Sequence, residues 1–185
     1  MNSRPRILVL GHARHGKDTL AEILTRNHGM RCASTSAAAA QIVRLALAEQ
    51  GITYESDEAC FADRVNHRSF WFDTIADLND PDPATLVRHM LKDHDVVLGL
   101  RSAREFEAAA DLFDAIWWID ASARGVPQEP TSSMDIVFNA ARMVLIDNGG
   151  SLADLERNVA SAMADAWISL ADRTPDLLEN CNETP

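Results

Sequence analysis

The stretch Gly11–Glu22, "GHARHGKDTLAE", follows the apolar run "ILVL". Its two glycines and Lys17 have the spacing G-x-x-x-x-G-K, in which glycines let main-chain N–H groups turn inward around phosphate oxygens. This motif needs a strand before it and a helix after it, and the sequence predicts both, at 6–11 and 17–28. We therefore expect a phosphate-binding loop.

Each residue of this loop is a candidate for binding the nucleotide: Gly11, His12, Ala13, Arg14, His15, Gly16, Lys17, Asp18 and Thr19. Lys17 is expected to reach the β- and γ-phosphates of ATP and to follow the transferred group. Asp18 stands where a Ser or Thr normally coordinates Mg²⁺. Its carboxylate can hold the ion directly or through a water, and Thr19 can supply the hydroxyl or merely cap the helix.

Composition and charge set limits on the function. The chain has 185 residues, of which 46% are hydrophobic and 24% are charged, as in an ordinary soluble globular protein. It has no apolar run long enough to span a membrane and no leader pattern. Its three cysteines lie far apart without metal-ligand spacing, which predicts free thiols in the cytoplasm. The net charge of −11 disfavours broad nucleic-acid binding but leaves room for a local basic groove.

Strand and helix patterns alternate along the chain, which predicts an α/β fold with helices on both faces of a mainly parallel five-stranded sheet. Ligands bind such sheets at the carboxyl ends of the strands. We expect one domain over 1–170, with a helical insertion at 52–93, a lid-like loop at 121–135 and a flexible tail at 171–185. The expected strands are 6–11, 30–34, 95–100, 114–120 and 142–148. The expected helices are 17–28, 36–50, 57–78, 84–93, 102–112, 133–141 and 151–170.

Two arginines begin the segment "GLRSAREFEAA", which follows the expected strand 95–100. Arg101 and Arg104 would then lie at the ligand edge of the sheet, where guanidinium groups stabilise the charge of a transferring phosphoryl group. Arg104 is also a candidate for binding the acceptor. The alternative is a solvated helix start, in which Glu105 and Glu107 pair with the two arginines.

The segment "ADRVNHRSFWFDTIADL" is the candidate acceptor site. On a helix, Arg64, His67, Arg68 and Trp71 would share one stripe that can hold a phosphate and stack a base. The alternative is a core tryptophan flanked by solvated charges.

Two aspartates of the same segment, Asp63 and Asp73, are candidates for the base that takes the proton of an acceptor hydroxyl. We prefer Asp63, which directly precedes an arginine. Ser34 and Ser36 follow the second expected strand and also lie at the ligand edge.

Four segments together resemble the phage P-loop kinases that phosphorylate 5-hydroxymethyluracil in DNA: "GHARHGKDT", "GLRSAREFEAA", "IWWIDAS" with the proline-rich loop and "TSSMDI" after it, and "LIDNGGSL". The resemblance implies a P-loop kinase fold, ATP and Mg²⁺ on Gly11–Thr19, and transfer of the γ-phosphate to the hydroxymethyl oxygen of the base in the host cytoplasm. It also implies that Asn148 and Gly149 pass the adenine ring. It does not fix the acceptor residues.

Two other functions stay open. Phage deoxynucleoside-monophosphate kinases are similar and act on free nucleotides. The second is a nucleotide-binding regulator that does not catalyse transfer. Two features permit it: no acidic residue ends the expected strand 95–100, and Asp18 follows Lys17 where the usual motif has Ser or Thr. The expected lid carries one basic residue, Arg124, which argues against a standard adenylate kinase. Oligomeric state is not predicted.

Overall fold

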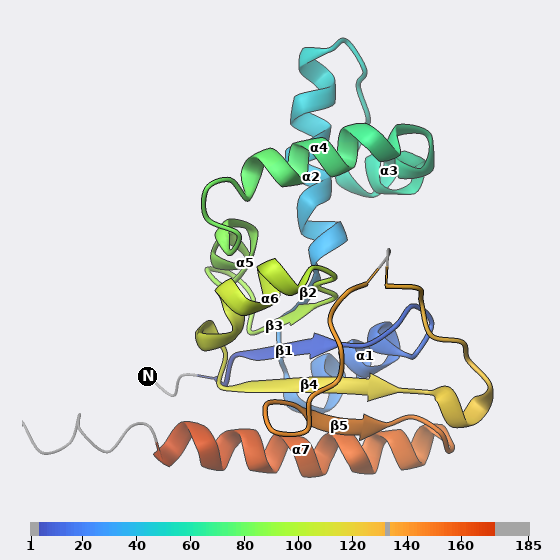
Figure 1. Cartoon of the computed structure of the whole chain (residues 1–185), viewed down its shortest axis with the longest axis vertical. Coiled ribbons are helices and arrows are strands. Elements are labelled where there is room, and N and C mark those ends of the chain that lie inside the picture. Colours follow the sequence, from blue (N-terminus) through green and yellow to red (C-terminus); the bar gives the residue numbers. More distant parts are fainter. Residues whose placement is uncertain (1–3, 132–133, 173–185) are drawn as a thin grey trace, which may run out of the picture.

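The computed structural model describes residues 4–131 and 134–172, and its five strands form one parallel sheet in the order β2-β3-β1-β4-β5. The parallel α/β sheet predicted from the sequence is therefore confirmed. Because all strands run in parallel, their carboxyl ends lie at one edge, to which the arrowheads point in Figure 1. The strands are β1 (Ile7–Leu10), β2 (Cys32–Ser34), β3 (Val96–Leu98), β4 (Ala115–Asp120) and β5 (Val144–Asp147).

One face of the sheet is covered by α1 (Lys17–His28) and α7 (Leu152–Asp172), which share a buried cluster with alternate residues of β1 and β4. The start of α7 has a capping box. Ser151 N donates to Asp154 Oδ2 at 2.8 Å, and Asp154 N donates back to Ser151 Oγ at 3.2 Å. These reciprocal bonds satisfy two N–H groups that the first turn cannot pair.

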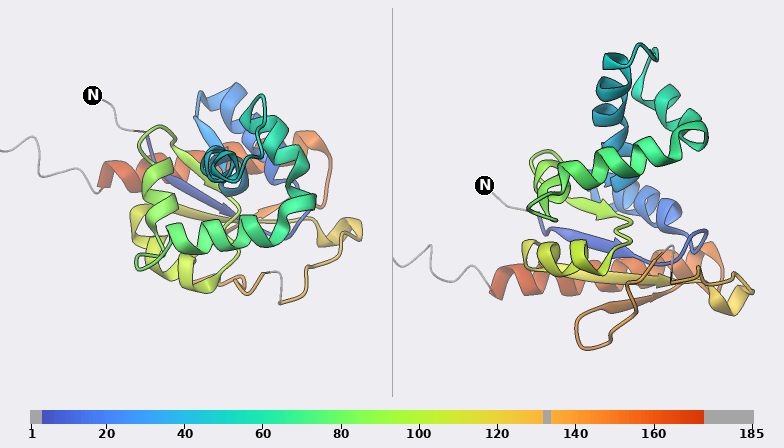
Figure 2. Two further views of the ribbon diagram at one scale, coloured as in Figure 1. Left: turned by 90° about the horizontal axis from the view of Figure 1, so that it is seen from above. Right: turned by 45° about the horizontal axis from the view of Figure 1, so that its top comes forward.

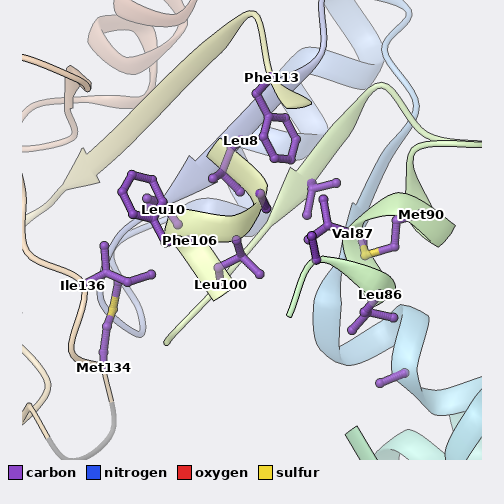
Figure 3. Close-up of a cluster of buried hydrophobic side chains, with 14 of the residues drawn as sticks. Leu8, Leu10, Leu86, Val87, Met90, Leu100, Phe106, Phe113, Met134 and Ile136 are labelled. Atoms are coloured by element: carbon purple, nitrogen blue, oxygen red, sulfur yellow. The ribbon is translucent and has the colours of Figure 1, made fainter. Parts of the chain in front are cut away.

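The other face is covered by α2 (Thr35–Glu49), α5 (Thr85–Met90), α6 (Ala103–Ala109) and the 3-10 turn η2 (Ala110–Leu112). Leucine, valine, methionine and phenylalanine side chains from these elements pack on β1 and β3 (Figure 3). The strands β1, β3 and β4 thus have an apolar layer on each side, as their nearly continuous apolar sequences predict. The edge strand β5 leaves Val144 and Leu145 exposed.

The expected helix 57–78 is broken into three pieces, namely α3 (Asp57–Ala62), the 3-10 turn η1 (Asp63–His67) and α4 (Arg68–Leu78). Asp63 causes the break locally, since its carboxylate accepts hydrogen bonds from Tyr54 Oη at 2.7 Å and Asn66 Nδ2 at 2.5 Å. Short polar side chains that bond locally compete with continued α-helix. Together with the outer part of α2, these pieces form an arm that projects from the sheet (Figures 1 and 2).

The expected helix 133–141 is wrong for residues 134–141; Ser133 lies outside the described residues. Met134 and Ile136 are buried in the core cluster of Figure 3 while Asp135 and Val137 are exposed, which is the alternation of an extended chain. Asp135 N donates to Arg101 O at 3.1 Å. Tertiary contacts therefore override the local helical pattern.

Within residues 4–131 and 134–172, none of the helices has the length and apolar character needed to span a membrane.

Candidate active site

The phosphate loop joins β1 to α1 at the carboxyl edge of the sheet, and both of its glycines are required by their surroundings. Gly11 has φ 140°, and a Cβ there would lie 2.5 Å from Ile119 O. Gly16 has φ 103° and caps α1, where a Cβ would collide with Asn148 Nδ2. Only glycine adopts these angles without strain and lets β4 and β5 approach the loop so closely.

Lys17 turns back over its own loop. Its Nζ donates to Gly11 O at 2.6 Å and to His12 O at 2.8 Å. Burial lowers the pKa of this ammonium group and the nearby Arg101 charge lowers it further, while the carboxylates of Glu129 and Asp18 act in the opposite direction. Lys17 and Arg101 thus bring two positively charged side chains near each other at the loop, where a phosphate would bind.

The two loop histidines tie the phosphate loop to the segment after β4. His15 is fully buried, its Nδ1 lies 2.9 Å from the Ala121 N–H, and its Nε2 lies 3.4 Å from Pro127 O. His12 Nδ1 accepts from Glu129 N at 3.2 Å. Burial and the neighbouring His15 lower the pKa of His12, which keeps this acceptor available.

Asn148 holds the loop from the side of β5. This buried residue donates from Nδ2 to His15 O at 2.9 Å, and its main-chain N–H donates to Asp120 O at 2.7 Å. Gly149 N donates to Asp147 Oδ1 at 2.8 Å, which closes the turn before α7. The turn therefore lies beside the phosphate loop, and its contact with adenine stays a prediction.

An unexpected carboxylate lies on the phosphate loop. Glu129 Oε2 accepts from Ala13 N at 2.6 Å, and Glu129 Oε1 accepts from Arg101 Nη1 at 2.6 Å. Arg101 thus lies at the carboxyl ends of the strands, where the sequence places it. Its side chain is linked to the phosphate loop through Glu129. Arg14, at the tip of the loop, has φ 65° and is exposed.

Asp18 and Thr19, the predicted Mg²⁺ residues, occupy the first turn of α1, where Asp18 is exposed and Thr19 is half-buried. Both offer the oxygen atoms that Mg²⁺ prefers. Within 4–131 and 134–172, no three His, Cys, Asp or Glu side chains gather as a ready-made metal cluster. Mg²⁺ in kinases is bound by one or two protein oxygens plus substrate phosphates, so this residue set fits the ion.

A cavity of about 540 Å³ lies beside the phosphate loop. Gly99 lines it, and the Gly99 carbonyl oxygen accepts a hydrogen bond from Thr35 Oγ1 at 3.1 Å. A Cβ on Gly99 would lie 3.9 Å from Lys17 Cε, so this part of the lining adjoins the lysine of the phosphate loop. The polar lining includes Thr35, Ser36, Asn79, Arg101, Ser102, Arg104, Glu105, Thr131 and Asp135.

Apolar side chains complete the cavity, and one of them is an exposed aromatic ring. Phe72 of α4 is 73% exposed and lies on the wall with Ile75 and Leu86. The cavity lining also includes an acidic side chain. The Glu105 carboxylate accepts a hydrogen bond from Asn79 Nδ2 at 2.9 Å. Burial raises the pKa of Glu105.

The predicted acceptor residues divide into two groups. Arg104 lines the cavity, and so does Ser36. The remaining ones are not among the described residues that line it: Ser34, Asp63, Arg64, His67, Arg68, Trp71 and Asp73. Ser34 instead caps α2 through Ala37 N at 3.1 Å.

The predicted stripe does not form, because η1 interrupts the helix between its members. Arg64 lies over the Phe61 ring, 3.9 Å from its centroid, and His67 Nε2 lies 3.3 Å from Asp63 Oδ2. Trp71 is only 6% exposed and packs in the core, so the core alternative describes it, and the expected base-stacking role does not fit. Arg68 and Asp73 are exposed.

Sequence reasoning missed three residues of this region. Glu129 and Phe72 give no local signal, since one acid in a proline-containing loop and one phenylalanine on a helix are both common. Asp120 had a signal, because it ends the apolar strand "IWWI". Its Oδ1 lies 3.1 Å from His15 Nδ1 and accepts from Ser122 Oγ at 2.6 Å, at the start of the turn η3 (Ser122–Arg124).

No family model and no curated protein sequence matches this chain. Solved structures do. A gluconokinase from Sinorhizobium meliloti 1021 has a TM-score of 0.51 at 14% identity over 93% of this chain and 99% of its own. The protein TT1252 from Thermus thermophilus has a TM-score of 0.50 at 18% identity over 88% and 98%. A sugar kinase from Janibacter sp. HTCC2649 has a TM-score of 0.43 at 13% identity over 89% and 96%. The first two likenesses show that the chain shares the α/β fold of these two proteins, the first of which is a gluconokinase.

Proposed function

We propose that this protein is a phosphotransferase that moves the γ-phosphoryl group of ATP to a hydroxyl group of an acceptor in the cavity beside the phosphate loop. The observation that carries the proposal is the shared boundary of the two sites. Gly99 and Arg101 line the cavity, and they lie beside Lys17 and the phosphate loop. An acceptor hydroxyl in the cavity would therefore face the terminal phosphate.

In this reaction the acceptor oxygen forms a bond to γ-phosphorus, the bond from γ-phosphorus to the bridging oxygen breaks, and ADP leaves. Bound Mg²⁺ would neutralise phosphate charge. Main-chain N–H groups of the loop and Lys17 hold the phosphates, and Arg101 stabilises the equatorial oxygens. The hydroxyl proton passes to a carboxylate. Glu105 lines the cavity and has a raised pKa, which suits that role better than Asp63, which lies outside the lining.

We further propose that the acceptor is a nucleobase derivative, with 5-hydroxymethyluracil in DNA as the first candidate. An exposed aromatic ring on the cavity wall, Phe72, offers a stacking surface that an aliphatic sugar acid does not need. Arg104, which also lines the cavity, offers a charge for a nucleotide phosphate. The volume of about 540 Å³ lies in the range for a small ligand, so DNA would present the base flipped out of the duplex. The resemblance of the four segments to DNA kinases supports the same acceptor.

The test supplies γ-labelled ATP and Mg²⁺ with three acceptors in parallel. These are a duplex containing 5-hydroxymethyluracil, a mixture of free deoxynucleoside monophosphates, and gluconate. Label on the duplex alone supports the DNA kinase. Label on free nucleotides alone makes the protein a precursor kinase, and label on gluconate alone overturns the nucleobase proposal.

A matched duplex that contains thymine controls for label that does not depend on the hydroxyl. ATP binding without label on any acceptor would overturn the phosphotransferase proposal and favour the non-catalytic nucleotide-binding regulator.

A further inference from the structure

The anion site of the phosphate loop is filled by a side chain of the protein itself. The two carboxylate oxygens of Glu129 are both engaged, one by Ala13 N and one by Arg101 Nη1, each at 2.6 Å. A main-chain N–H of a glycine loop and a guanidinium group are the donors that such a loop offers to phosphate oxygens. The Glu129 carboxylate therefore lies in the position of a phosphate group.

Charge adds to this fit. Burial acts to raise the pKa of Glu129, but hydrogen bonds from Arg101 and Ala13, with the charges of Arg101 and Lys17, lower it overall. Glu129 is thus an anion surrounded by the cationic groups of the nucleotide site. Arg101, assigned above to the transferring phosphoryl group, is already engaged by this carboxylate.

The segment that carries Glu129 is anchored to the same loop at two more points. Glu129 N donates to His12 Nδ1 at 3.2 Å, and Pro127 O lies 3.4 Å from His15 Nε2. Pro127 and Pro130 flank the glutamate, and their fixed φ angles reduce the number of conformations that the free segment can adopt. Placing Glu129 on the loop therefore costs little conformational entropy.

We propose that Glu129 is an internal competitor of ATP, which must leave the phosphate loop before the nucleotide phosphates can bind. This inference rests on the proposed function, because it assumes that ATP uses this loop. When only a fraction of the protein molecules is in the state that can bind a ligand, the apparent affinity for that ligand is reduced by that fraction. The contact thus lowers apparent ATP affinity and keeps Arg101 from the phosphates until ATP displaces it.

The test measures the dissociation constants of ATP and of adenosine by titration calorimetry for the full chain and for Glu129→Gln. The variant keeps the shape of the side chain but loses the charge that the cationic site attracts. We expect ATP to bind roughly tenfold more tightly to the variant. Adenosine has no phosphates and should bind both proteins equally. The matched control is Glu107→Gln, which removes a surface carboxylate 2.7 Å from Arg142 and should leave both constants unchanged.

Unchanged or weaker ATP binding by Glu129→Gln, in a protein that still transfers phosphate, would overturn this inference and leave the proposed function standing. An equal gain for adenosine would also overturn it, because a general loosening of the site would then explain the effect. If neither protein binds ATP, the proposed function fails together with the inference.

Discussion

Asn148 donates a hydrogen bond from its side-chain amide to the main-chain oxygen of His15, at 2.9 Å and across 133 positions of the chain. It joins the turn after β5 to the middle of the phosphate loop. Since neighbouring Gly16 has no side chain, the amide lies directly against the loop. The shape of the phosphate loop therefore depends on a residue that follows the edge strand β5.

Asn148→Ala should leave the His15 carbonyl without its buried donor. We expect the free energy of unfolding to fall by roughly 1–3 kcal/mol and ATP binding to weaken. Chemical denaturation and titration calorimetry measure the two effects. Asn27→Ala, an exposed asparagine on α1, is the control and should change neither. A loss of stability with unchanged ATP affinity would show that Asn148 supports the fold alone.

Lys17→Ala should reduce transfer by roughly a hundredfold or more and leave the fold intact. The variant lacks the ammonium group whose positive charge stabilises the transferring phosphoryl group. Label transfer from ATP and circular dichroism measure these two properties. The control is Lys92→Ala, which replaces the only other lysine of the chain and is exposed. Full activity of Lys17→Ala would contradict the phosphotransferase assignment.

Asp18→Asn should raise the Mg²⁺ concentration needed for half-maximal transfer more than it weakens ATP binding without metal. The carboxylate is replaced by a neutral amide, which is a poorer ligand for a hard cation. Glu22→Gln removes a carboxylate one turn further along α1 and serves as the control. An unchanged Mg²⁺ requirement in Asp18→Asn would mean that Asp18 does not help to hold the ion.

Phe72→Ala should raise the KM for a nucleobase acceptor by roughly tenfold and leave the KM for ATP unchanged, because stacking on an aromatic ring stabilises a bound base by about 1–3 kcal/mol. Steady-state kinetics with each substrate varied in turn gives both constants. Val65→Ala truncates another exposed apolar side chain of the arm and is the control. Equal acceptor KM values for Phe72→Ala and the parent protein would exclude the stacking role.

Asp95 makes stability depend on acidity. Its carboxylate is 9% exposed and accepts hydrogen bonds from Arg31 and Arg4. Hydrogen bonding to Arg31 lowers the pKa of Asp95 from 3.8 to about 2. Because the folded pKa is the lower one, the stabilisation is present above pH 3.8 and is lost as pH falls toward 2.

Asp95→Asn should therefore cost about 2 kcal/mol at neutral pH, and the difference from the parent protein should vanish near pH 2. Denaturation at a series of pH values measures it. Asp93→Asn, an exposed neighbour, should show no such trend. A constant difference across the whole series would mean that packing, rather than the ionised carboxylate, stabilises this position.

The sequence predicts the sheet and the phosphate loop well because both are specified locally. The glycine spacing, the apolar strand before it and the helix after it are all contained within about twenty residues, and α1 begins and ends where expected. The loop residues that hold Lys17 also come from the same short segment.

The acceptor side was harder to predict because contacts between distant segments decide it. Trp71 and Phe72 are neighbours in the sequence, yet one is buried in the core and the other is exposed at the cavity. A periodic pattern gave the helix but not the side of it that faces solvent, since Asp63 ends α3 early and changes the phase. Glu129 reaches the phosphate loop from 116 residues away, a pairing that no local pattern encodes.

The arm formed by the outer part of α2 with α3, η1 and α4 projects from the sheet and returns to it before α5 (Figure 1). None of its residues makes the hydrogen bonds described above for the phosphate loop, which come from the segments that follow β1, β4 and β5. Changes to exposed residues of the arm, such as Phe72, should therefore leave the hydrogen bonds of the phosphate loop in place, whereas Trp71 must stay to fill the core. A different acceptor preference can be sought by varying the exposed residues of the arm that line the cavity and keeping the side chains that pack in the core.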